Sequence, residues 1–562
     1  LGSTFVYHKP RKMLHYFISC PKPTSQFVEI ELRIPCSTAG LIRLQLPAWR
    51  AGRYQLANFA QNIRGFQVHT SDGKLVAFQK ITKDCWELQV PHPSEVLVSY
   101  SYWAGKMDAG SAWTDDQQVY LNLVNFCFEV LEFKEEEIEI QVQIPDYPQQ
   151  VLALTEVSPC VWSAKNFQEL ADATLLAAKE LIQWDYRVGA TTFRCCIHGE
   201  VHFNPEQFLN QFQAFTQRMM DDFGEFPEPS YTFIFQLLPY PHYHGVEHRK
   251  GTVITFGPAV SLQDTTAMEE LIGISCHELY HAWNVCRIRP KELLPYDFSK
   301  ETYTQAGWIL EGITTYFGDL YLLKSGVYDL PTYLKHFEKI VNRESTHLGW
   351  KNYSIRESSF DLWLDGYVPG IPDRKVNIYS RGALISFCLD VLLLKEGSSL
   401  AQFMSQLWKA YGVPFQGYTL EEVEGLLISQ VGEPAKIRGF IDAYIGGKED
   451  LFPLLQKCFR ELGISLVENV GPNALLHRMG VIVDELDEIQ RIHPSSKAFN
   501  YLMRNDRILT YRLEEESLLW KLDIDRQGRT LQLCFESEDG PFYPTLSLCL
   551  QTSTGLREEW IK

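Results

Sequence analysis

Two histidines four positions apart form the most informative group in this 562-residue sequence. They belong to the stretch His277-Glu278-Leu279-Tyr280-His281. On a helix, residues i and i+4 lie on one face, so both imidazoles can bind one metal ion. Glu278 then lies beside the open coordination position, where it can accept a proton from a bound water. The spacing therefore predicts a Zn²⁺ site that splits a bond with water.

Such a zinc site needs a third protein ligand. The best candidate is Glu311, because it lies in an otherwise apolar segment of helical period, residues 308–317. A carboxylate there is costly to bury unless it binds a metal or pairs with a cation. The alternative is a partly exposed glutamate on a surface helix. We expect one Zn²⁺ per chain, bound by His277, His281 and Glu311.

The helix predicted around the motif is itself apolar. Its apolar neighbours are Leu271, Ile272, Ile274, Ala282 and Val285. A chance match to the motif in a chain this long has odds on the order of a few per cent. Buried His and Glu side chains on such a helix need partners, and one metal ion supplies them.

Helical periodicity continues through most of the chain from residue 205 to 446. A first helix is predicted over residues 205–223 and a strand over 231–238. Further helices are predicted over about 265–286, 303–325, 331–343, 379–395, 400–411, 419–431 and 434–446. Thr266 and Glu269 predict a capping box, and Gly326 predicts a helix end.

The two flanking regions have the alternating pattern of half-buried strands. Residues 13 to about 185 contain such runs at 27–32 and 137–142, with a turn at Ser71-Asp72-Gly73. Residues from about 455 to 562 return to short strands, with a turn at Arg526-Gln527-Gly528. At roughly 150 residues per domain, the length predicts three or four domains.

Composition narrows the class of protein. Hydrophobic residues make up 45% of the chain, and the net charge is −18, which opposes binding to nucleic acid or to anionic membrane. No apolar run reaches the roughly 18 residues of a membrane span. The 13 cysteines are odd in number and lack a Cys-x-x-Cys spacing, which favours a reducing, cytoplasmic location. A signal peptide removed before Leu1 stays an open alternative.

Several motifs, in order, resemble one known family. They are His277-Glu278-Leu279-Tyr280-His281-Ala282-Trp283-Asn284-Val285, Arg287-Ile288-Arg289-Pro290, Pro295-Tyr296-Asp297, Glu311-Gly312-x-Thr314-x-Tyr316 and Pro47-Ala48-Trp49-Arg50-Ala51-Gly52-Arg53-Tyr54. The family is that of the glycyl aminopeptidase-like zinc metallopeptidases with a PDZ domain, gluzincins distantly related to aminopeptidase N. The resemblance extends along nearly the whole chain. It implies hydrolysis of peptides from a free N-terminus, with small residues such as Gly or Ala as the family expectation.

The resemblance also assigns residues for substrate binding. His244-Gly245-Val246-Glu247-His248 is similar to the family's Gly-Gly-x-Glu-His. It implies that Gly245 and Glu247 contact substrate, with Glu247 binding the free α-amine; an ordinary strand glutamate is the alternative. His244 replaces the usual first Gly, which would narrow the pocket near the amine. His242, His244 and His248 could be interpreted as a second metal site, but we do not favour it, because histidines at strand ends usually face solvent.

Tyr379 is the predicted oxyanion donor. Tyr379-Ser380-Arg381-Gly382 resembles the Tyr-x-Lys/Arg-Gly at the start of a later helix in gluzincin aminopeptidases. A tyrosine suits this role because its hydroxyl stays protonated at neutral pH. A core aromatic with a solvated hydroxyl is the alternative. Ile378 replaces a frequent Tyr.

The last part of the chain resembles a PDZ domain. The similar segments are residues 463–467 and 480–483, Pro494-Ser495-Ser496-Lys497-Ala498, and Asn505-Asp506-Arg507-Ile508-Leu509. A PDZ domain binds an extended peptide by β-augmentation and captures its C-terminal carboxylate. Arg478-Met479-Gly480-Val481 is a poor match to the carboxylate loop, so a structural β module is the alternative.

We therefore expect a multidomain α+β fold. Residues 1–185 would form an N-terminal β domain, residues 186–452 a thermolysin-like, mainly α catalytic domain with a helical extension, and residues 453–562 a PDZ-like β domain. The leading functional expectation is a zinc aminopeptidase acting on peptides. A catalytically silent peptide-binding scaffold and a gluzincin hydrolase of a non-peptide substrate are the alternatives. The sequence does not indicate the oligomeric state.

Overall fold

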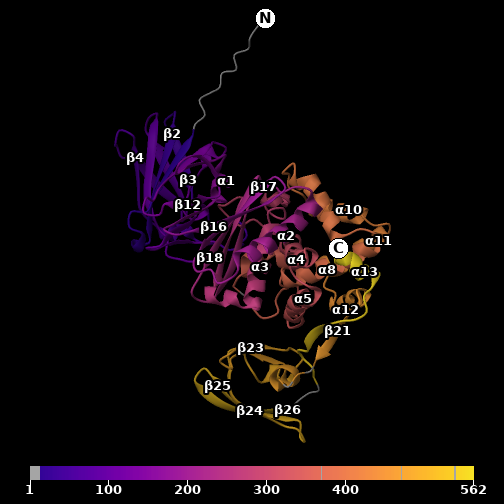
Figure 1. Cartoon of the computed structure of the whole chain (residues 1–562). Coiled ribbons are helices and arrows are strands. Elements are labelled where there is room, and N and C mark those ends of the chain that lie inside the picture. The colour runs from indigo at the N-terminus through magenta and orange to yellow at the C-terminus, as the bar shows by residue number, and fades with distance from the viewer. Residues whose placement is uncertain (1–12, 369, 470, 472, 537–539) are drawn as a thin grey trace.

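The chain folds into a β-rich N-terminal part, a central part in which helices cover a small sheet, and a smaller C-terminal β part (Figure 1). The computed structural model describes residues 13–368, 370–469, 471, 473–536 and 540–562. The expected multidomain α+β class, with a β-rich beginning and a helical middle, is confirmed.

Three sheets build the N-terminal part. A seven-stranded sheet has the order β13-β14-β11-β1-β2-β7-β4, and two four-stranded sheets have the orders β10-β3-β6-β5 and β12-β15-β9-β8. Burial alternates along β2, so its apolar residues face one core. The bounds are β1 Leu14–Ser19, β2 Phe27–Cys36, β3 Gly40–Gln45, β4 Ile63–Thr70, β5 Ala77–Thr82, β6 Cys85–Val90, β7 Ser94–Trp103, β8 Ala112–Thr114, β9 Gln118–Asn122, β10 Glu129–Val130, β11 Ile138–Gln143, β12 Gln149–Leu152, β13 Thr155–Ser158, β14 Val161–Ala164, α1 Phe167–Ala171 and β15 Thr174–Ala178.

A mixed five-stranded sheet carries the central part. Its order is β16-β17-β18-β20-β19, so β19 is an edge strand. The bounds are β16 Ile182–Val188, β17 Thr191–His198, β18 Ser230–Leu237, β19 His242–His248 and β20 Gly251–Gly257. β17, β18 and β20 are parallel, whereas β19 runs antiparallel to β20. The helix α3 packs against β19 and β20, which brings the His-Glu-x-x-His segment to the sheet edge.

The predicted helices of the central part are present, several of them shorter than predicted, together with two short helices over residues 355–365 that the sequence did not predict. Their bounds are α2 Pro205–Phe223, α3 Thr265–Tyr280, α4 Thr314–Lys324, α5 Leu330–Ser345, α6 Ile355–Phe360, α7 Leu362–Asp365, α8 Ser380–Lys395, α9 Leu400–Leu407, α10 Leu420–Ser429 and α11 Pro434–Phe440. The predicted capping box of Thr266 and Glu269 is wrong, because Asp264 is the N-cap residue of α3 and makes no side-chain capping bond. Gly326 follows the end of α4 in the left-handed region, as expected.

Three segments continue helices with π geometry. They are η7 Trp308–Ile313, η9 Trp408–Gly412 and η10 Ile441–Ile445. A π segment inside a helix often marks a functional site, and η7 contains Glu311. Hydrophobic periodicity does not distinguish these turns from α-helix.

The C-terminal part has its own small core around Trp520. Its elements are α12 Phe452–Glu461, β21 Ile464–Asn469, β22 Val481–Val483, β23 Ile489–Ile492, β24 Arg507–Glu514, β25 Leu519–Arg526, β26 Arg529–Glu536, β27 Thr545–Leu550 and α13 Gly555–Trp560. The helices α12 and α13 are additions to the predicted strands. The chain end lies beside α8 (Figure 1), and Trp560 is buried in the core of the central part. The described residues contain no helix long and apolar enough to span a membrane.

Candidate metal centre and substrate cleft

His277, His281 and Glu311 converge on one point. The Nε2 atoms of the two histidines lie 3.1 Å apart. Glu311 Oε2 lies 3.4 Å from His281 Nε2 and 3.7 Å from His277 Nε2. Two imidazole nitrogens and one carboxylate oxygen are a donor set typical of a hydrolytic zinc site. Among the described residues this group is the one with metal-ligand spacing.

Asn284 joins the two elements that carry these ligands. Its carbonyl oxygen accepts a hydrogen bond from His281 Nδ1 at 2.8 Å. Its side-chain amide donates to the Ile309 carbonyl in η7 at 2.7 Å and to Thr314 Oγ1 at 3.0 Å. Asn284 is fully buried. It therefore fixes the ring of His281 relative to the π-helical segment that presents Glu311.

The charges of the three residues suit a cation. Burial lowers the pKa of His277 to about 3, so this imidazole is neutral and offers a lone pair. Burial opposes charge on His281, but Glu311, Glu247 and Glu278 raise its pKa to about 10. A metal ion would displace that proton, because a ligating histidine must be neutral. Glu311 Oε2 is buried without a hydrogen-bond partner, so the residues present fit a divalent metal.

Glu278 lies beside the ligands and against the edge strand. Its Oε2 atom is buried without a hydrogen-bond partner. A Cβ atom on Gly245 would lie 2.2 Å from Glu278 Oε1, so β19 can approach the carboxylate only because residue 245 has no side chain. Burial raises the pKa of Glu278 to about 8, and the charges of Glu247 and Glu311 act in the same direction.

Glu247 follows Gly245 on the same face of β19, since side chains alternate along a strand. The side chain is 8% exposed, and burial raises its pKa. Its carboxylate lies under a loop of the N-terminal part: a Cβ atom on Gly52 would be 2.3 Å from Glu247 Oε2. Gly52 has φ +73°, a conformation that favours glycine. The arrangement leaves a buried carboxylate at a closed end of the site.

The loop over Glu247 is anchored by Trp49. The Trp49 indole donates to the Asp297 carbonyl at 2.8 Å, and its ring packs edge-on against Tyr296 at 5.6 Å between centroids. Two sequence motifs some 250 residues apart, at 47–54 and 295–297, therefore pack on each other.

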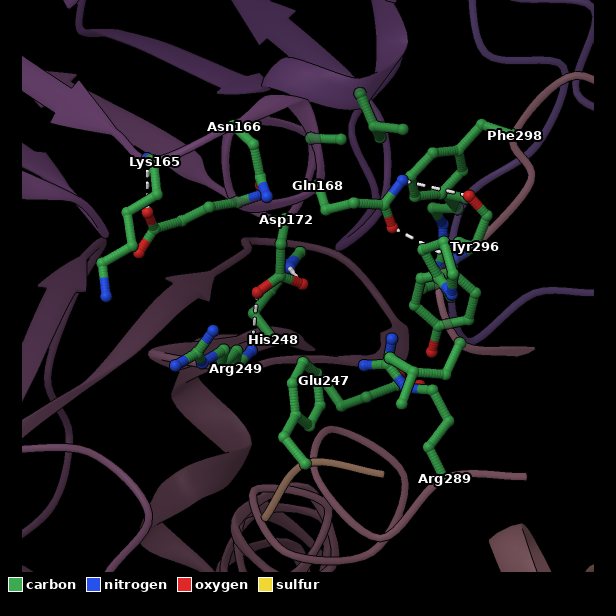
Figure 2. Close-up of a pocket in the computed structure, with 18 of the residues that line it drawn as sticks. Lys165, Asn166, Gln168, Asp172, Glu247, His248, Arg249, Arg289, Tyr296 and Phe298 are labelled. Carbon is green, nitrogen blue, oxygen red and sulfur yellow. Dashed lines mark hydrogen bonds and ion pairs between the residues drawn. The ribbon is translucent and has the colours of Figure 1, made fainter. Parts of the chain in front are cut away.

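A cavity of about 250 Å³ has Glu247 and His248 among its lining residues (Figure 2). Figure 2 shows Asp172 of the N-terminal part facing His248 of the central part. Arg289 and Tyr296 lie to the right of this pair in the view. Asp172 Oδ1 lies 3.4 Å from His248 Nδ1. The His248 side chain therefore contacts the N-terminal part, and it does not reach the metal ligands.

Tyr379 stands at the N-terminus of α8. The Asn377 carboxamide oxygen accepts hydrogen bonds from the backbone N–H groups of Tyr379 and Ser380, which caps the helix. The phenol lies within hydrogen-bonding reach of Glu311. Burial raises the pKa of Tyr379 well above its usual value, so its hydroxyl keeps its proton.

Close glycine contact sets the distance between Glu311 and Tyr379. The segments η7 and α8 meet at Gly312 and Gly382, where a Cβ atom on Gly312 would lie 2.6 Å from the Gly382 Cα. Both glycines belong to the quoted motifs, Glu311-Gly312 and Arg381-Gly382.

Two site residues escaped the sequence reasoning. Asn284 lies inside a quoted motif, but nothing in the sequence indicated which groups it joins. Tyr367 lies in a loop without periodicity, and its phenol interacts with Tyr379 and donates to the Gly52 carbonyl at 3.2 Å. Tyr367 thus connects the predicted oxyanion donor to the N-terminal loop.

Comparisons with known proteins agree with this architecture. No curated protein matches the sequence. An aminopeptidase N family protein from Idiomarina loihiensis has a similar crystal structure, with a TM-score of 0.88, 22% identity, and coverage of 98% of this chain and 100% of that one. An M1 zinc metallopeptidase from Deinococcus radiodurans has a TM-score of 0.50 and 14% identity, and the match covers 78% of this chain and 94% of that one. At these identities the likeness concerns the fold.

Two family descriptions match the sequence itself. Residues 15–179 match the Peptidase M61 N-terminal domain, and residues 270–385 match the M61 glycyl aminopeptidase. Neither match extends to residues 453–562, so the PDZ-like identity of that segment stays a prediction. The second match contains the His-Glu-x-x-His segment, Glu311 and Tyr379, and the first contains the loop over Glu247. This chain therefore belongs to the M61 glycyl aminopeptidase family of peptidases.

Proposed function

We propose that this protein is a zinc-dependent aminopeptidase that removes the N-terminal residue of peptides. One observation carries the proposal: the ligand set His277, His281 and Glu311 occurs together with a buried base, Glu278, and with a buried carboxylate, Glu247, on the edge strand. Family membership supports peptidase activity. The three-domain division at residues 185 and 452, the single zinc per chain and the residue roles below belong to this proposal.

The chain's own residues would divide the chemical work. Zinc held by His277, His281 and Glu311 would lower the pKa of a bound water and polarise the scissile carbonyl. Glu278 would accept the proton of the attacking water and deliver it to the leaving amine. The protonated hydroxyl of Tyr379 would donate a hydrogen bond to the developing oxyanion.

Glu247 would select a free N-terminus. Among the described residues the buried Glu247 carboxylate has no ion pair within 4 Å, and an N-terminal ammonium would supply one. The loop at Gly52 closes the site beyond this carboxylate, which favours an exopeptidase and small first residues such as Gly or Ala. Gly245 would keep the base and substrate backbone close. The resulting partner class is a peptide with a free N-terminus.

The test combines metal content with two substitutions. We would measure zinc by atomic absorption after dialysis, and kcat/KM on Gly-peptides with free and acetylated N-termini. Glu278→Gln should keep zinc and lose about 100-fold or more in kcat. Glu247→Gln should keep zinc and raise KM for free-amine peptides only.

Each alternative has a distinct result. Wild-type protein without zinc and without activity would favour a silent scaffold. Full activity of Glu278→Gln would contradict the mechanism in which Glu278 is the base. Hydrolysis of a non-peptide ester with no peptide cleavage would favour the non-peptide hydrolase. Equal cleavage of free and acetylated peptides would remove Glu247 from its proposed role.

A further inference from the structure

A cleft of about 490 Å³ opens next to the metal ligands, on the side away from Glu247. One wall is the face of α3 that carries His277, and the opposite wall is α5. Its floor includes Asp319 on α4, and Tyr243 at the start of β19 lies at its edge. The cleft adjoins the catalytic site, because its lining includes His277, Glu278 and Tyr379, whereas Glu247 is not part of that lining.

The edge strand β19 indicates which residue of a bound peptide would lie next to the cleft. Glu247, Gly245 and Tyr243 share one face of β19, at steps of about 6.6 Å. An extended peptide adds to an exposed edge by β-augmentation. Glu278 and Tyr379, the proposed base and oxyanion donor, line the cleft. A peptide with its amine at Glu247 and its first carbonyl beside these two residues would therefore carry its second residue into the cleft. This step rests on the proposed function, and it puts the second residue over the cleft.

A missing side chain opens the inner end of the cleft. Gly273 precedes His277 by four residues and lies on the same face of α3. A Cβ atom on Gly273 would lie 3.6 Å from both Asp319 Oδ1 and Tyr328 Oη. The Asp319 carboxylate therefore faces the space above Gly273, one helical turn from the metal ligand.

Apart from the base Glu278, Asp319 is the one acidic residue among the described residues of the cleft lining that lacks an ion pair. Glu269 lies 3.1 Å from His336 Nε2, and Glu270 lies 3.3 Å from Lys339 Nζ. Among the described residues no ion pair or hydrogen bond of the Asp319 side chain is found within the usual distances. The residue is only half-buried, so an entering group can reach it. Burial raises the pKa of Asp319, while the charges of His336 and Lys339 act against that rise; a closer cation would remove the penalty.

We propose that Asp319 selects a cationic side chain, lysine or arginine, in the second residue of the peptide. The cleft is large enough for such a side chain, and its long aliphatic stem would pack along Ile274 and Ile340. The ammonium or guanidinium would then form a charge-assisted hydrogen bond with the carboxylate. Asp319 is thus a specificity residue of the site and takes no part in bond cleavage.

The experiment varies one position of the peptide and one residue of the full-length chain. Wild type, Asp319→Asn and Asp221→Asn would be assayed on Gly-Xaa-Ala-amide, with lysine, norleucine or glutamate at Xaa. Asp221 is an exposed acid on α2, so its variant controls for the change in net charge. Zinc content is measured in all three proteins, because a structural role of Asp319 would lower it.

We expect wild type and Asp221→Asn to prefer lysine over norleucine by about tenfold or more in kcat/KM. A preference of this size is what one charge-assisted hydrogen bond contributes. Asp319→Asn should bring that ratio to within about threefold of unity, with norleucine cleavage and zinc content unchanged. A wild-type preference for norleucine or glutamate, the latter through Arg343 on the outer wall, would overturn the proposal. So would a lysine preference that survives Asp319→Asn.

The proposal is testable even if the peptides are not cleaved. The affinities of the lysine and norleucine peptides for zinc-loaded Glu278→Gln, with and without Asp319→Asn, can be measured by calorimetry. If the peptides are not cleaved but lysine binds more tightly than norleucine only when Asp319 is present, the specificity site is supported although the proposed hydrolytic function is wrong. Equal binding of both peptides contradicts the specificity site alone.

Discussion

At the scale of single residues, Asn284 determines how the two halves of the metal centre fit together. It accepts from His281 through its backbone and donates to η7 through its side chain. Asn284→Ala keeps the backbone carbonyl that accepts from His281 but removes the side-chain bonds to η7 and Thr314. We predict that it lowers zinc affinity by about 10- to 100-fold, because the residue that orients His281 is then no longer tied to the segment that presents Glu311. Competition with a fluorescent chelator measures this affinity directly.

A matched control separates orientation from general destabilisation. The Asn342 side chain also joins two elements, because it donates to the Leu546 carbonyl at 2.7 Å and accepts from the Leu546 N–H at 2.8 Å. Asn342→Ala should lower the thermal midpoint and leave zinc affinity as in wild type. Equal zinc affinity in Asn284→Ala and Asn342→Ala would contradict the role given to Asn284.

The sequence predicted the role of a residue where that role follows from residues close to it in the chain. The spacing of His277 and His281 follows from one helical turn, so it could be read without a structure. Glu311 needed a second clue, a charge in an apolar segment. Asn284 and Tyr367 act through contacts with distant segments, and Asp319 gains its role from the missing side chain of Gly273. No periodicity encodes those contacts.

At the scale of elements, the contact of η7 with α8 holds Glu311 near Tyr379. Gly312→Ala would force the two backbones apart, since its Cβ would meet the Gly382 Cα at 2.6 Å. We predict a loss of about 1–3 kcal/mol in the free energy of unfolding and a drop in kcat/KM. Urea unfolding and peptide assays would show both effects.

Gly425→Ala provides the control for this prediction. Gly425 lies on α10, where an added Cβ meets no atom within 4 Å. The substitution should leave stability unchanged or raise it by about 0.4–1 kcal/mol, because the unfolded chain loses freedom. If Gly312→Ala behaves like Gly425→Ala, the close contact does not position the site.

Element prediction succeeded where the chain follows one period. The helices α2, α5 and α8 match their predicted ranges within two residues. The start of α3 matches its prediction, but the helix ends at Tyr280, earlier than predicted. The segments η7, η9 and η10 could not be predicted, because π turns and α turns bury nearly the same side chains. The helix α13 has six residues, too few to show a helical period. The helix α12 has ten residues, as many as the predicted α10, and was missed.

At the scale of the whole molecule, segments from the N-terminal part and from the end of the chain pack against the central part that contains the metal centre. The loop at Gly52 covers Glu247, and the helix α13 packs against α8. The Trp560 indole donates to the Tyr316 hydroxyl at 2.8 Å, and that hydroxyl donates to Asp390 Oδ2 at 2.7 Å. Tyr316 lies on α4, directly after the segment with Glu311. The end of the chain thus supports the element that follows the metal centre.

Two tryptophans of similar burial test this division of the C-terminal part. Trp560→Ala removes a side chain from the core of the central part, whereas Trp520→Ala removes one from the separate small core. Each should cost about 3–5 kcal/mol in the unit that contains it. We predict that Trp560→Ala lowers the unfolding midpoint of the central part and its zinc retention. Trp520→Ala should unfold the small core and leave zinc content and cleavage of short peptides as in wild type. Tryptophan fluorescence would monitor unfolding, and metal analysis would give the zinc content. Loss of zinc in both variants would mean that the two cores unfold as one unit and that α13 has no special role in supporting the metal centre.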